Sequence, residues 1–361
     1  MTFTNLQALG WNETFMEHFA PFASNADYTV ARVALEHKHL YRVYSEHGDL
    51  LASVSGKLRH TAFGREDYPA VGDWVVISAR PEERKATVHG ILPRFSKFSR
   101  KVAGNVTEEQ IVAANVNTVF LVMALNNDFN VRRLERYLVA AWESGATPVV
   151  ILTKMDLCDE VEERISDVES VAFGVPIHAV SSELNQGLEQ LAPYLGEGKT
   201  VALLGSSGVG KSTLVNRLCG EERMETGGVR EGDDRGKHTT TYRELIRMPQ
   251  GGLLIDTPGM RELQLWESDE SSLTGSFSDV EELAENCFYR DCEHRQEPGC
   301  AVQQAIADGT LDADRYQSYV KLQRELAYLE RKNDVRAQIA EKERWKKAGA
   351  IGRENARRKR S

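Results

Sequence analysis

A glycine-rich octapeptide is the strongest chemical signal in the chain. Residues 205–212 read Gly-Ser-Ser-Gly-Val-Gly-Lys-Ser, which matches the P-loop pattern G-x-x-x-x-G-K-S at every fixed position. The apolar run before it, 201–204, predicts a buried parallel strand, and 212–218 predicts a helix. In this strand-loop-helix context, backbone amides and the helix N-terminus face phosphate groups. The alternative is a glycine-rich turn that binds nothing.

The P-loop pattern assigns a role to each of its positions. Lys211 is expected to reach the β- and γ-phosphates, and Ser212 is expected to bind Mg²⁺. The predicted phosphate-binding residues are Gly205, Ser206, Ser207, Gly208, Val209, Gly210, Lys211, Ser212 and Thr213.

A second acidic turn follows another apolar run. Asp256-Thr257-Pro258-Gly259 comes directly after 253–255, which predicts a buried strand. A carboxylate at this place can hold the magnesium shell, and the Gly259 amide can sense the γ-phosphate. The D-x-P-G turn is common by itself, so its support comes from its place at a strand end after the P-loop.

A polar segment between these motifs carries the predicted switch. Residues 235–241 read Arg-Gly-Lys-His-Thr-Thr-Thr, and a GTPase needs a threonine on Mg²⁺ in this interval. Thr239 or Thr240 is expected to supply it, with Thr240 slightly ahead. Met260 stands where Ras-like enzymes have a water-orienting glutamine, so His238 is the candidate for positioning water. The predicted catalytic residues are His238, Lys211 and Thr240; a solvated loop with a surface histidine is the alternative.

A further tetrapeptide predicts which base is bound. Thr153-Lys154-Met155-Asp156 follows the apolar run 148–152. The Asp156 carboxylate can accept hydrogen bonds from both donors on the guanine edge, a pair that adenine lacks. The stem of Lys154 is expected to cover the base. Thr153 replaces the usual asparagine, which we expect to weaken one base contact. Ser181 and Ser182, after another predicted strand, are expected to back the base.

The order of these motifs is unusual. The guanine-selecting loop normally follows the P-loop by roughly a hundred residues, whereas here it precedes it. The chain is therefore predicted to be a circularly permuted GTPase. Permutation is physically acceptable because ligands bind at the carboxyl ends of the strands of an open α/β sheet, whatever their order along the chain.

A separate cluster of soft ligands lies near the C-terminal end. Cys287, Cys292, His294 and Cys300 form the pattern C-x4-C-x-H-x5-C. Four such ligands in 14 residues suit one closed, structural tetrahedral zinc site, and a reduced, metal-free cluster is the alternative. The five cysteines are odd in number and no signal peptide is recognised, which argues against a disulfide framework. Cys158 and Cys219 are expected to be free thiols.

Charge is distributed unevenly along the chain. The formal net charge is −9, but residues 321–361 hold 14 Lys or Arg and 6 Asp or Glu, so the other 320 residues carry −17. A basic tail of this kind favours a polyanionic partner, although a solvated terminus is equally compatible. No apolar run is long enough to span a membrane.

The first hundred residues predict a small β-barrel. Strand-like runs recur at 28–35, 40–44, 51–58, 73–78 and 87–92, with glycines between or within them. Five-stranded barrels include the OB-fold, which often binds oligonucleotides. The basic residues that could line such a face are Lys57, Arg59, His60, Arg94, Lys97, Arg100 and Lys101.

A multidomain architecture follows from these segments. We expect an all-β OB-fold barrel at 1–103, a permuted α/β P-loop GTPase domain at 104–275, a zinc-binding domain at 276–310 and a helical basic tail at 311–361. Within the second domain, 116–124 predicts a buried strand and 131–144 an amphipathic helix that ends at Gly145. Leu322, Leu326 and Leu329 mark one face of the tail helix.

With these parts in this order, the chain resembles the ribosome small-subunit-dependent GTPase A family over nearly its whole length. The resemblance rests on the reversed loops, on 237–241, on Asp256-Thr257-Pro258-Gly259 and on the Cys287–Cys300 cluster with Glu297-Pro298-Gly299 inside it. It implies GTP hydrolysis to GDP, stimulated by the small ribosomal subunit during that subunit's late maturation. It also implies rRNA binding and a cytoplasmic location; a monomer without membrane contact is the default expectation.

Two other functions stay open at this stage. A GTP-binding RNA-assembly scaffold with little hydrolysis is compatible with Met260 in place of glutamine. An ATP-using P-loop enzyme is disfavoured by Asp156 and by the lack of a recognisable acceptor site.

Overall fold

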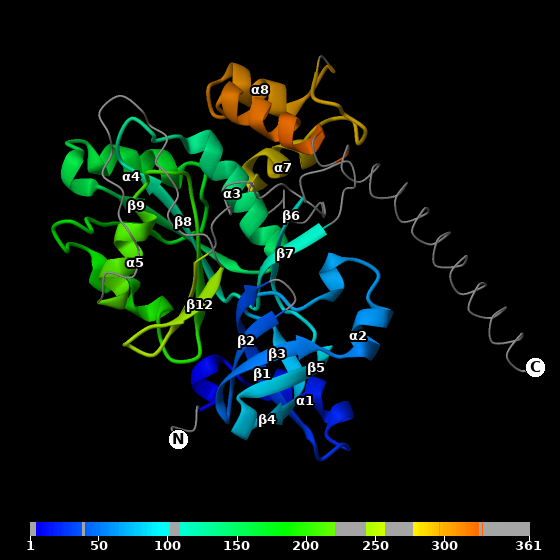
Figure 1. Ribbon diagram of the computed structural model, residues 1–361. Helices are drawn as coiled ribbons and strands as arrows, with labels where there is room; N and C mark the ends of the chain where they lie inside the picture. The colour runs from blue at the N-terminus through cyan, green and yellow to red at the C-terminus, as the bar shows by residue number, and fades with distance from the viewer. Residues whose placement is uncertain are drawn as a thin grey trace, which may run out of the picture. The chain divides into compact units, whose positions relative to one another are not determined.

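The computed structural model describes residues 5–37, 40–101, 109–220, 243–256, 277–295, 297–324 and 327. The chain divides into two compact units, residues 1–264 and 265–361 (Figure 1). Each unit is treated by itself below. The predicted switch residues, Gly259, Met260 and most of the basic tail lie outside the described residues. The four predicted domain boundaries stay predictions.

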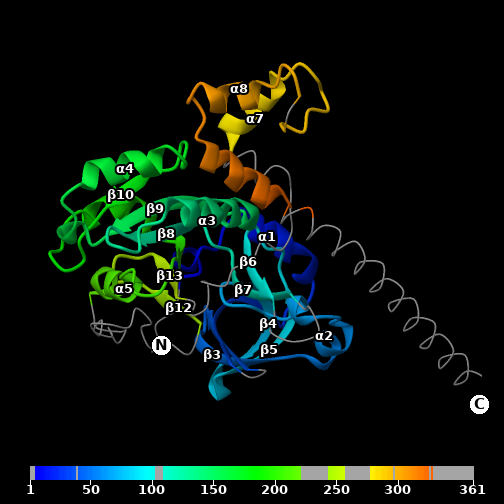
Figure 2. The same ribbon diagram turned by 90° about the horizontal axis from the view of Figure 1, so that it is seen from above.

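The first unit begins with a closed five-stranded barrel. The strands run in the order β1-β2-β3-β5-β4, and β4 closes the barrel by pairing with β1. Every neighbouring pair is antiparallel except β3 with β5. This is the OB-fold, as predicted, and Figure 2 shows its strands clustered with α2 at one side. The bounds are β1 Tyr28–His37, β2 Leu40–Ser45, β3 Gly48–Val54, α2 Gly56–Thr61, β4 Trp74–Arg80 and β5 Lys85–Ile91.

One predicted strand of the barrel is wrong in its second half. The run 51–58 was expected to be extended throughout, but β3 ends at Val54 and α2 follows. The Ser55 side chain accepts a hydrogen bond from the Leu58 amide at 3.1 Å, so it caps the helix N-terminus. Lys57, Arg59 and His60 therefore lie on a helix and not on a strand.

A permuted α/β sheet continues from the barrel. Its order is β10-β9-β8-β11-β13-β12, with parallel neighbours except for the antiparallel pair β12 and β13. The P-loop strand β11 lies between β8 and β13, although β8 precedes it by many residues. The bounds are β8 Thr118–Ala124, α3 Val131–Ser144, β9 Thr147–Thr153, α4 Val161–Glu169, β10 Ile177–Ala179, β11 Thr200–Leu204, α5 Lys211–Cys219, β12 Glu244–Arg247 and β13 Leu253–Asp256.

Helix α3 has the predicted bounds. Asn130 caps its first turn by accepting a hydrogen bond from the Arg133 amide at 2.9 Å. Gly145 ends it with a positive φ of 82°, a conformation that favours glycine. An added Cβ at Gly145 would lie 2.8 Å from the Phe95 carbonyl oxygen, so the close approach also requires glycine.

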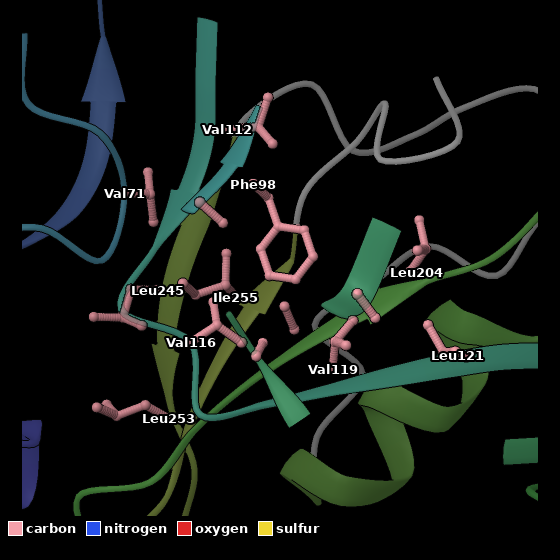
Figure 3. Close-up of a cluster of buried hydrophobic side chains, with 14 of the residues drawn as sticks. Val71, Phe98, Val112, Val116, Val119, Leu121, Leu204, Leu245, Leu253 and Ile255 are labelled. Atoms are coloured by element: carbon pink, nitrogen blue, oxygen red, sulfur yellow. The ribbon is translucent and has the colours of Figure 1, made fainter. Parts of the chain in front are cut away.

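A two-stranded sheet that the sequence pattern did not predict joins the barrel to the α/β sheet. Its strands, β6 Lys97–Lys101 and β7 Glu109–Ala114, are antiparallel. Figure 3 shows Phe98 and Val112 from this pair beside Leu245 and Ile255 of the large sheet. All four side chains are at most 2 % exposed and belong to one buried cluster. The barrel, the linking strands and the α/β sheet thus share a hydrophobic core.

A buried arginine also fastens the barrel to its neighbours. Arg32 of β1 donates to the carbonyl oxygens of Leu9 in the N-terminal segment, Gly72 in the barrel and Asn115 before β8. Burial lowers the pKa of Arg32 to about 9, with partial compensation from Asp73. These hydrogen bonds satisfy three carbonyl groups from segments far apart in sequence.

The N-terminal segment covers one end of the barrel with aromatic side chains. Asn12 caps α1 (Glu13–Phe19), and Trp11 and Phe15 pack beside Trp74 with ring centroids 4.8 and 5.8 Å away. The short 3-10 turns of the unit are Gln7–Leu9, Ala20–Phe22, Arg65–Asp67, Pro81–Glu83, Met155–Leu157 and Leu188–Tyr194.

The second unit is small and helical where it is described. It contains α7 (Ser278–Glu285), α8 (Ala301–Ala307) and a helical stretch over 313–324. Arg315 makes two hydrogen bonds of 2.6 Å to the Asp279 carboxylate, and its guanidinium lies 4.7 Å from the Phe277 ring. Leu322 is buried, in line with its predicted apolar face, whereas Leu326 and Leu329 lie outside the described residues.

Candidate functional site

The carboxyl ends of four parallel strands lie at one edge of the α/β sheet. Strands β8, β9, β11 and β13 end there, and the loops after β9 and β11 carry the predicted guanine and phosphate motifs. Because all four strands are neighbours in the sheet, loops that are far apart in sequence meet at this edge.

The P-loop backbone is fixed by its glycines. Gly208 and Gly210 have φ values of 77° and 88°, which disfavour any residue with a Cβ. At Gly205 the constraint is space, since an added Cβ would lie 2.2 Å from the Val122 carbonyl oxygen at the end of β8. The loop therefore packs directly on the neighbouring strand.

The predicted phosphate-binding lysine lies inside this loop. Helix α5 begins at Lys211, which places Ser212 and Thr213 in its first turn. The Lys211 ammonium donates to the carbonyl oxygens of Gly205, at 2.7 Å, and Ser206. A cation held by loop carbonyl groups, beside a helix N-terminus, favours bound anions.

A hydrogen bond connects the predicted guanine loop to the P-loop. Thr153, the last residue of β9, is 2 % exposed, and its hydroxyl lies 2.6 Å from the Val209 carbonyl oxygen and 3.3 Å from that of Met123. The hydroxyl has one proton, so the shorter contact is its donated hydrogen bond. The structure thus places the two motifs side by side, and it gives the threonine a role in joining loops that the sequence did not reveal.

The residues after Thr153 turn sharply towards solvent. Lys154 has a φ of 60°, and Asp156 lies exposed in the 3-10 turn Met155–Leu157. The turn leaves the aspartate carboxylate accessible to a ligand. The Met155 amide donates to the Val180 carbonyl oxygen at 3.3 Å, which holds the turn against the strand-end segment after β10.

Ser181 and Ser182, which were predicted to back the base, follow the Val180 carbonyl that holds this turn. Ser181 is fully buried, and its hydroxyl oxygen accepts a hydrogen bond from the Leu184 amide at 3.1 Å. The Ser182 hydroxyl is buried and has no hydrogen-bond partner within the described part of the chain. Arg217 of α5 donates to the Ser182 carbonyl oxygen at 2.8 Å. The sequence did not single out Arg217, because nothing in the P-loop pattern specifies that position.

Of the remaining residues predicted for the nucleotide site, the structure describes only Asp256, and only its backbone. Asp256 ends β13, next to the P-loop strand, so its backbone lies at the expected edge. His238, Thr239, Thr240 and Gly259 lie outside the described residues.

The four predicted metal ligands come together in the second unit. Their ligand atoms all lie within 4.8 Å of one another. Cys287 Sγ is 3.9 Å from Cys300 Sγ, and His294 Nδ1 is 3.4 and 3.5 Å from these two sulfurs. Tetrahedral zinc with Zn–S bonds of about 2.3 Å requires ligand separations of roughly 3.7 Å. The cluster can therefore hold one metal ion.

Neighbouring groups orient the histidine. His294 has a φ of 58°, and its carbonyl oxygen accepts hydrogen bonds from Gln303 Nε2 at 2.7 Å and the Tyr316 hydroxyl at 3.2 Å. Burial lowers the pKa of His294, with Glu297 opposing, which favours the neutral imidazole that can bind metal. Sequence reasoning missed Gln303 and Tyr316, since they lie beyond the ligand pattern.

The Glu297 carboxylate closes the ligand loop. It accepts hydrogen bonds from the backbone amides of Glu293 at 3.0 Å and Arg295 at 2.8 Å. These bonds hold the segment between Cys292 and Cys300 in a compact turn, which brings distant ligands of the pattern together.

One residue assigned to an RNA face has a different role. Arg94 makes two hydrogen bonds of 2.7 Å to the Asp73 carboxylate and donates to the carbonyl oxygens of Glu66 and Tyr68. The Asp73 side chain is fully buried and that of Arg94 is 16 % exposed. The interpretation of Arg94 as an RNA contact is therefore wrong, because its guanidinium is used to neutralise a buried carboxylate.

Among the helices that the structure describes, none has the length and apolar character needed to cross a membrane.

Known proteins resemble the chain in sequence and structure. Residues 91–266 match the family described as RsgA GTPase. "Small ribosomal subunit biogenesis GTPase RsgA" of Opitutus terrae is 47 % identical over 350 residues, which cover 95 % of each chain. "Small ribosomal subunit biogenesis GTPase RsgA 1" of Oceanobacillus iheyensis is 47 % identical over 90 % of this chain and 93 % of its own.

Two solved structures share the architecture. YjeQ from Thermotoga maritima has a TM-score of 0.61 and 29 % identity, covering 83 % of this chain and 99 % of its own. YloQ, described as a circularly permuted GTPase, has a TM-score of 0.60 and 26 % identity, covering 83 % and 95 %. The permuted strand order described above agrees with the latter description.

Proposed function

The chain belongs to the RsgA family of GTPases, and on that premise we propose that it hydrolyses GTP as a nucleotide-controlled checkpoint in late maturation of the small ribosomal subunit. Its partners are GTP, GDP and the rRNA of that subunit. It acts in the cytoplasm as a monomer without membrane contact.

The observation that carries the nucleotide assignment is the Thr153–Val209 hydrogen bond. It joins residues 153–156 to the P-loop, although these two motifs occur in reversed order along the chain. Both lie at the same edge of the sheet, where a single nucleotide can contact them. Guanine then lies at Asp156, whose carboxylate accepts from the two donors of the base edge, with Thr153, Lys154, Met155, Ser181 and Ser182 around it. A site that pairs with both donors rejects adenine, which lacks them.

The phosphates are held by the P-loop. Amides of residues 205–213 and the N-terminus of α5 stabilise their negative charge, and Lys211 exchanges its contacts with Gly205 and Ser206 for phosphate oxygens. Hydrolysis needs water held in line with the γ-phosphate. We assign that task to His238, since Met260 can neither donate nor accept the required hydrogen bonds.

Magnesium is the ion expected with GTP. Ser212 and Asp256 supply hydroxyl and carboxylate oxygens, which suit Mg²⁺, and they belong to segments that follow neighbouring strands. Thr240, or Thr239, completes the set, and the Gly259 amide senses the γ-phosphate. The ion neutralises charge on the phosphate oxygens.

The metal of the second unit is zinc, and its role is structural. Three thiolates and one imidazole are soft and borderline ligands that select zinc, and their separations fit a closed tetrahedron. With four protein ligands, no coordination position remains for water.

A scaffold that binds GTP but scarcely hydrolyses it is the second candidate, and Met260 favours it. Phosphate release from GTP and ATP, measured with and without purified small subunits, decides between the two. The checkpoint requires slow basal GTP turnover that rises many-fold with subunits over repeated cycles. Binding without multiple turnover favours the scaffold, and a preference for ATP would contradict the guanine site.

A further inference from the structure

Strand β12 lies between the barrel and the strand that ends in Asp256. Glu244 pairs with Asp256 in β13 on one side and with Leu35 of barrel strand β1 on the other. Its N-terminal neighbour Arg243 follows directly on 221–242, the interval that contains the predicted switch residues. In Figure 1, β12 lies close to β2 of the barrel. One short strand is therefore connected to the switch by covalent bonds and to the barrel by hydrogen bonds.

Barrel side chains bind β12 at successive positions. Arg42 of β2 forms an ion pair with Glu244. The Tyr44 hydroxyl donates to the Leu245 carbonyl oxygen at 3.2 Å, and burial raises the pKa of Tyr44, which keeps this hydroxyl protonated. The Arg247 guanidinium lies 3.8 Å from the centre of the Tyr44 ring.

Two further ion pairs frame these contacts. Arg243 lies 3.8 Å from the Glu36 carboxylate of β1, and Arg247 lies 3.2 Å from Asp49 of β3. The contacts come from all three barrel strands nearest to β12. They involve its flanking residue and both of its ends, so they fix the strand along its whole length.

The side chains of β12 face two different cores. Leu245 is fully buried in the core shared with the barrel, beside Val71 and Ile255 in Figure 3. Ile246 points to the other face and is buried with Leu214 of α5. Packed cores change between discrete arrangements and do not deform freely. A displacement of the barrel would therefore be passed to the strand that leads into the nucleotide site.

The alternative, that these contacts only stabilise the packing of the barrel on the sheet, explains them less well. Arg32 already fastens the barrel through three buried hydrogen bonds, none of which involves β12. The Arg42 and Glu244 side chains are 39 % and 38 % exposed, and ion pairs with such exposure add little stability. Their arrangement along one strand is better suited to fixing its position.

We propose that β12 couples the barrel to the nucleotide site, so that RNA of the small subunit bound to the barrel sets the rate of GTP hydrolysis through contacts of Arg42 and Tyr44. This regulation rests on the proposed function, which supplies the RNA partner and the stimulated reaction. The coupling extends to binding, so RNA and nucleotide change each other's affinity by the same factor, and the nucleotide state changes the barrel at β2.

The test breaks these contacts without touching the nucleotide site. The double variant Arg42→Glu/Tyr44→Phe loses the ion pair and the hydroxyl donor but keeps the aromatic ring. Arg80→Glu is the matched control, since it reverses a charge in an ion pair of the barrel that is remote from β12. GTP turnover is measured at a saturating concentration of small subunits. Under this condition a variant that binds subunits more weakly is not mistaken for one that has lost the coupling.

The double variant should retain basal GTP turnover within about twofold, but the factor by which subunits increase turnover should fall at least tenfold. Arg80→Glu should keep the wild-type stimulation factor. The charge swap Arg42→Glu/Glu244→Arg should recover most of the stimulation that Arg42→Glu alone loses. Full stimulation in a folded double variant would overturn the proposal.

A second readout does not depend on subunits. Amide hydrogen exchange of β2 should differ between the GDP-bound protein and the protein with a non-hydrolysable GTP analogue, and the difference should vanish in the double variant. If the wild-type protein shows no stimulation by subunits, the proposed function fails, and this exchange measurement alone decides the coupling. Identical exchange of wild-type β2 in both nucleotide states would refute it.

Discussion

The proposed nucleotide site and the metal-ligand cluster would each hold a charged ligand, but they take their residues from the chain in opposite ways. Thr153 and Asp256 are the last residues of β9 and β13, and Ser182 and Lys211 follow β10 and β11. Their positions therefore depend on one sheet with a large buried core. Cys287, Cys292, His294 and Cys300 lie within 14 consecutive residues between two short helices. The two sites therefore differ in the source of the free energy that holds them in place. The packed sheet holds its site in place without a ligand, whereas a metal ion bound to the cluster would itself stabilise the unit that binds it.

The largest expected effect concerns the metal. Cys300→Ser, or removal of the metal by a chelator, should unfold the described part of the second unit, since structural zinc contributes on the order of 10 kcal/mol. Hydrogen exchange should accelerate over 278–324 and remain slow in α3. The control is Cys158→Ser, which removes a thiol from the first unit. If amide hydrogen exchange over 278–324 stayed as slow in the metal-free protein as in the metal-bound protein, the fold of this unit would not depend on the ion.

The second effect concerns base selection. Asp156→Asn should weaken GTP binding by roughly 10²-fold or more and abolish the preference over ATP, because the donors of guanine lose their acceptor. Titration with fluorescent nucleotides measures both quantities, and zinc content should not change. Asp159→Asn, three residues further on and exposed, is the matched control. A variant that still prefers GTP would place guanine recognition elsewhere.

A smaller effect is expected from the contact between the two loops. Thr153→Val leaves the Val209 carbonyl without its donor, which should cost about 1–2 kcal/mol, or roughly 5- to 30-fold in nucleotide affinity. Thr153→Asn retains a donor and should recover part of the loss. Thr147→Val changes a threonine at the exposed start of the same strand and should have no effect. Equal affinities for wild-type protein and Thr153→Val would make the hydrogen bond incidental.

The smallest effect tests whether the second unit has packing of its own. Arg315→Lys replaces two parallel hydrogen bonds to Asp279 with a point charge, at an expected cost of about 1 kcal/mol. With metal bound, the unit should stay folded and lose a few degrees of thermal stability. Arg290→Lys, at an exposed position, should leave its melting temperature unchanged. Unfolding of the metal-bound Arg315→Lys protein would contradict the dominance of the ion.

Sequence patterns predicted most accurately what is set by local chemistry. Helix α3 has the predicted bounds because Asn130 and Gly145 mark its ends through their own backbone preferences. The metal ligands could be named because they lie close together along the chain. The end of β3 was missed because Ser55 was read as part of an alternating strand and not as a helix cap.

Contacts between distant segments could not be predicted in this way. Arg94 looks like any exposed arginine in the sequence, and only the fold brings the buried Asp73 carboxylate to it. The hydrogen bond between Thr153 and Val209 was missed, because two strands and a helix separate these residues along the chain. The same reason hid Arg217, Gln303 and Tyr316.

The position of β11 in the sheet has a consequence for synthesis of the protein. Strands β8, β9 and β10 leave the ribosome before the P-loop strand, and β11 must then pair with the exposed edge of β8 before β13 can cover its other side. During translation the chain therefore passes through a stage with a complete barrel, a three-stranded sheet and an open edge. Open edges attract other strands. The sheet keeps an open edge until β13 has been synthesised and pairs with β11, so slower elongation before that point should lower the yield of native protein.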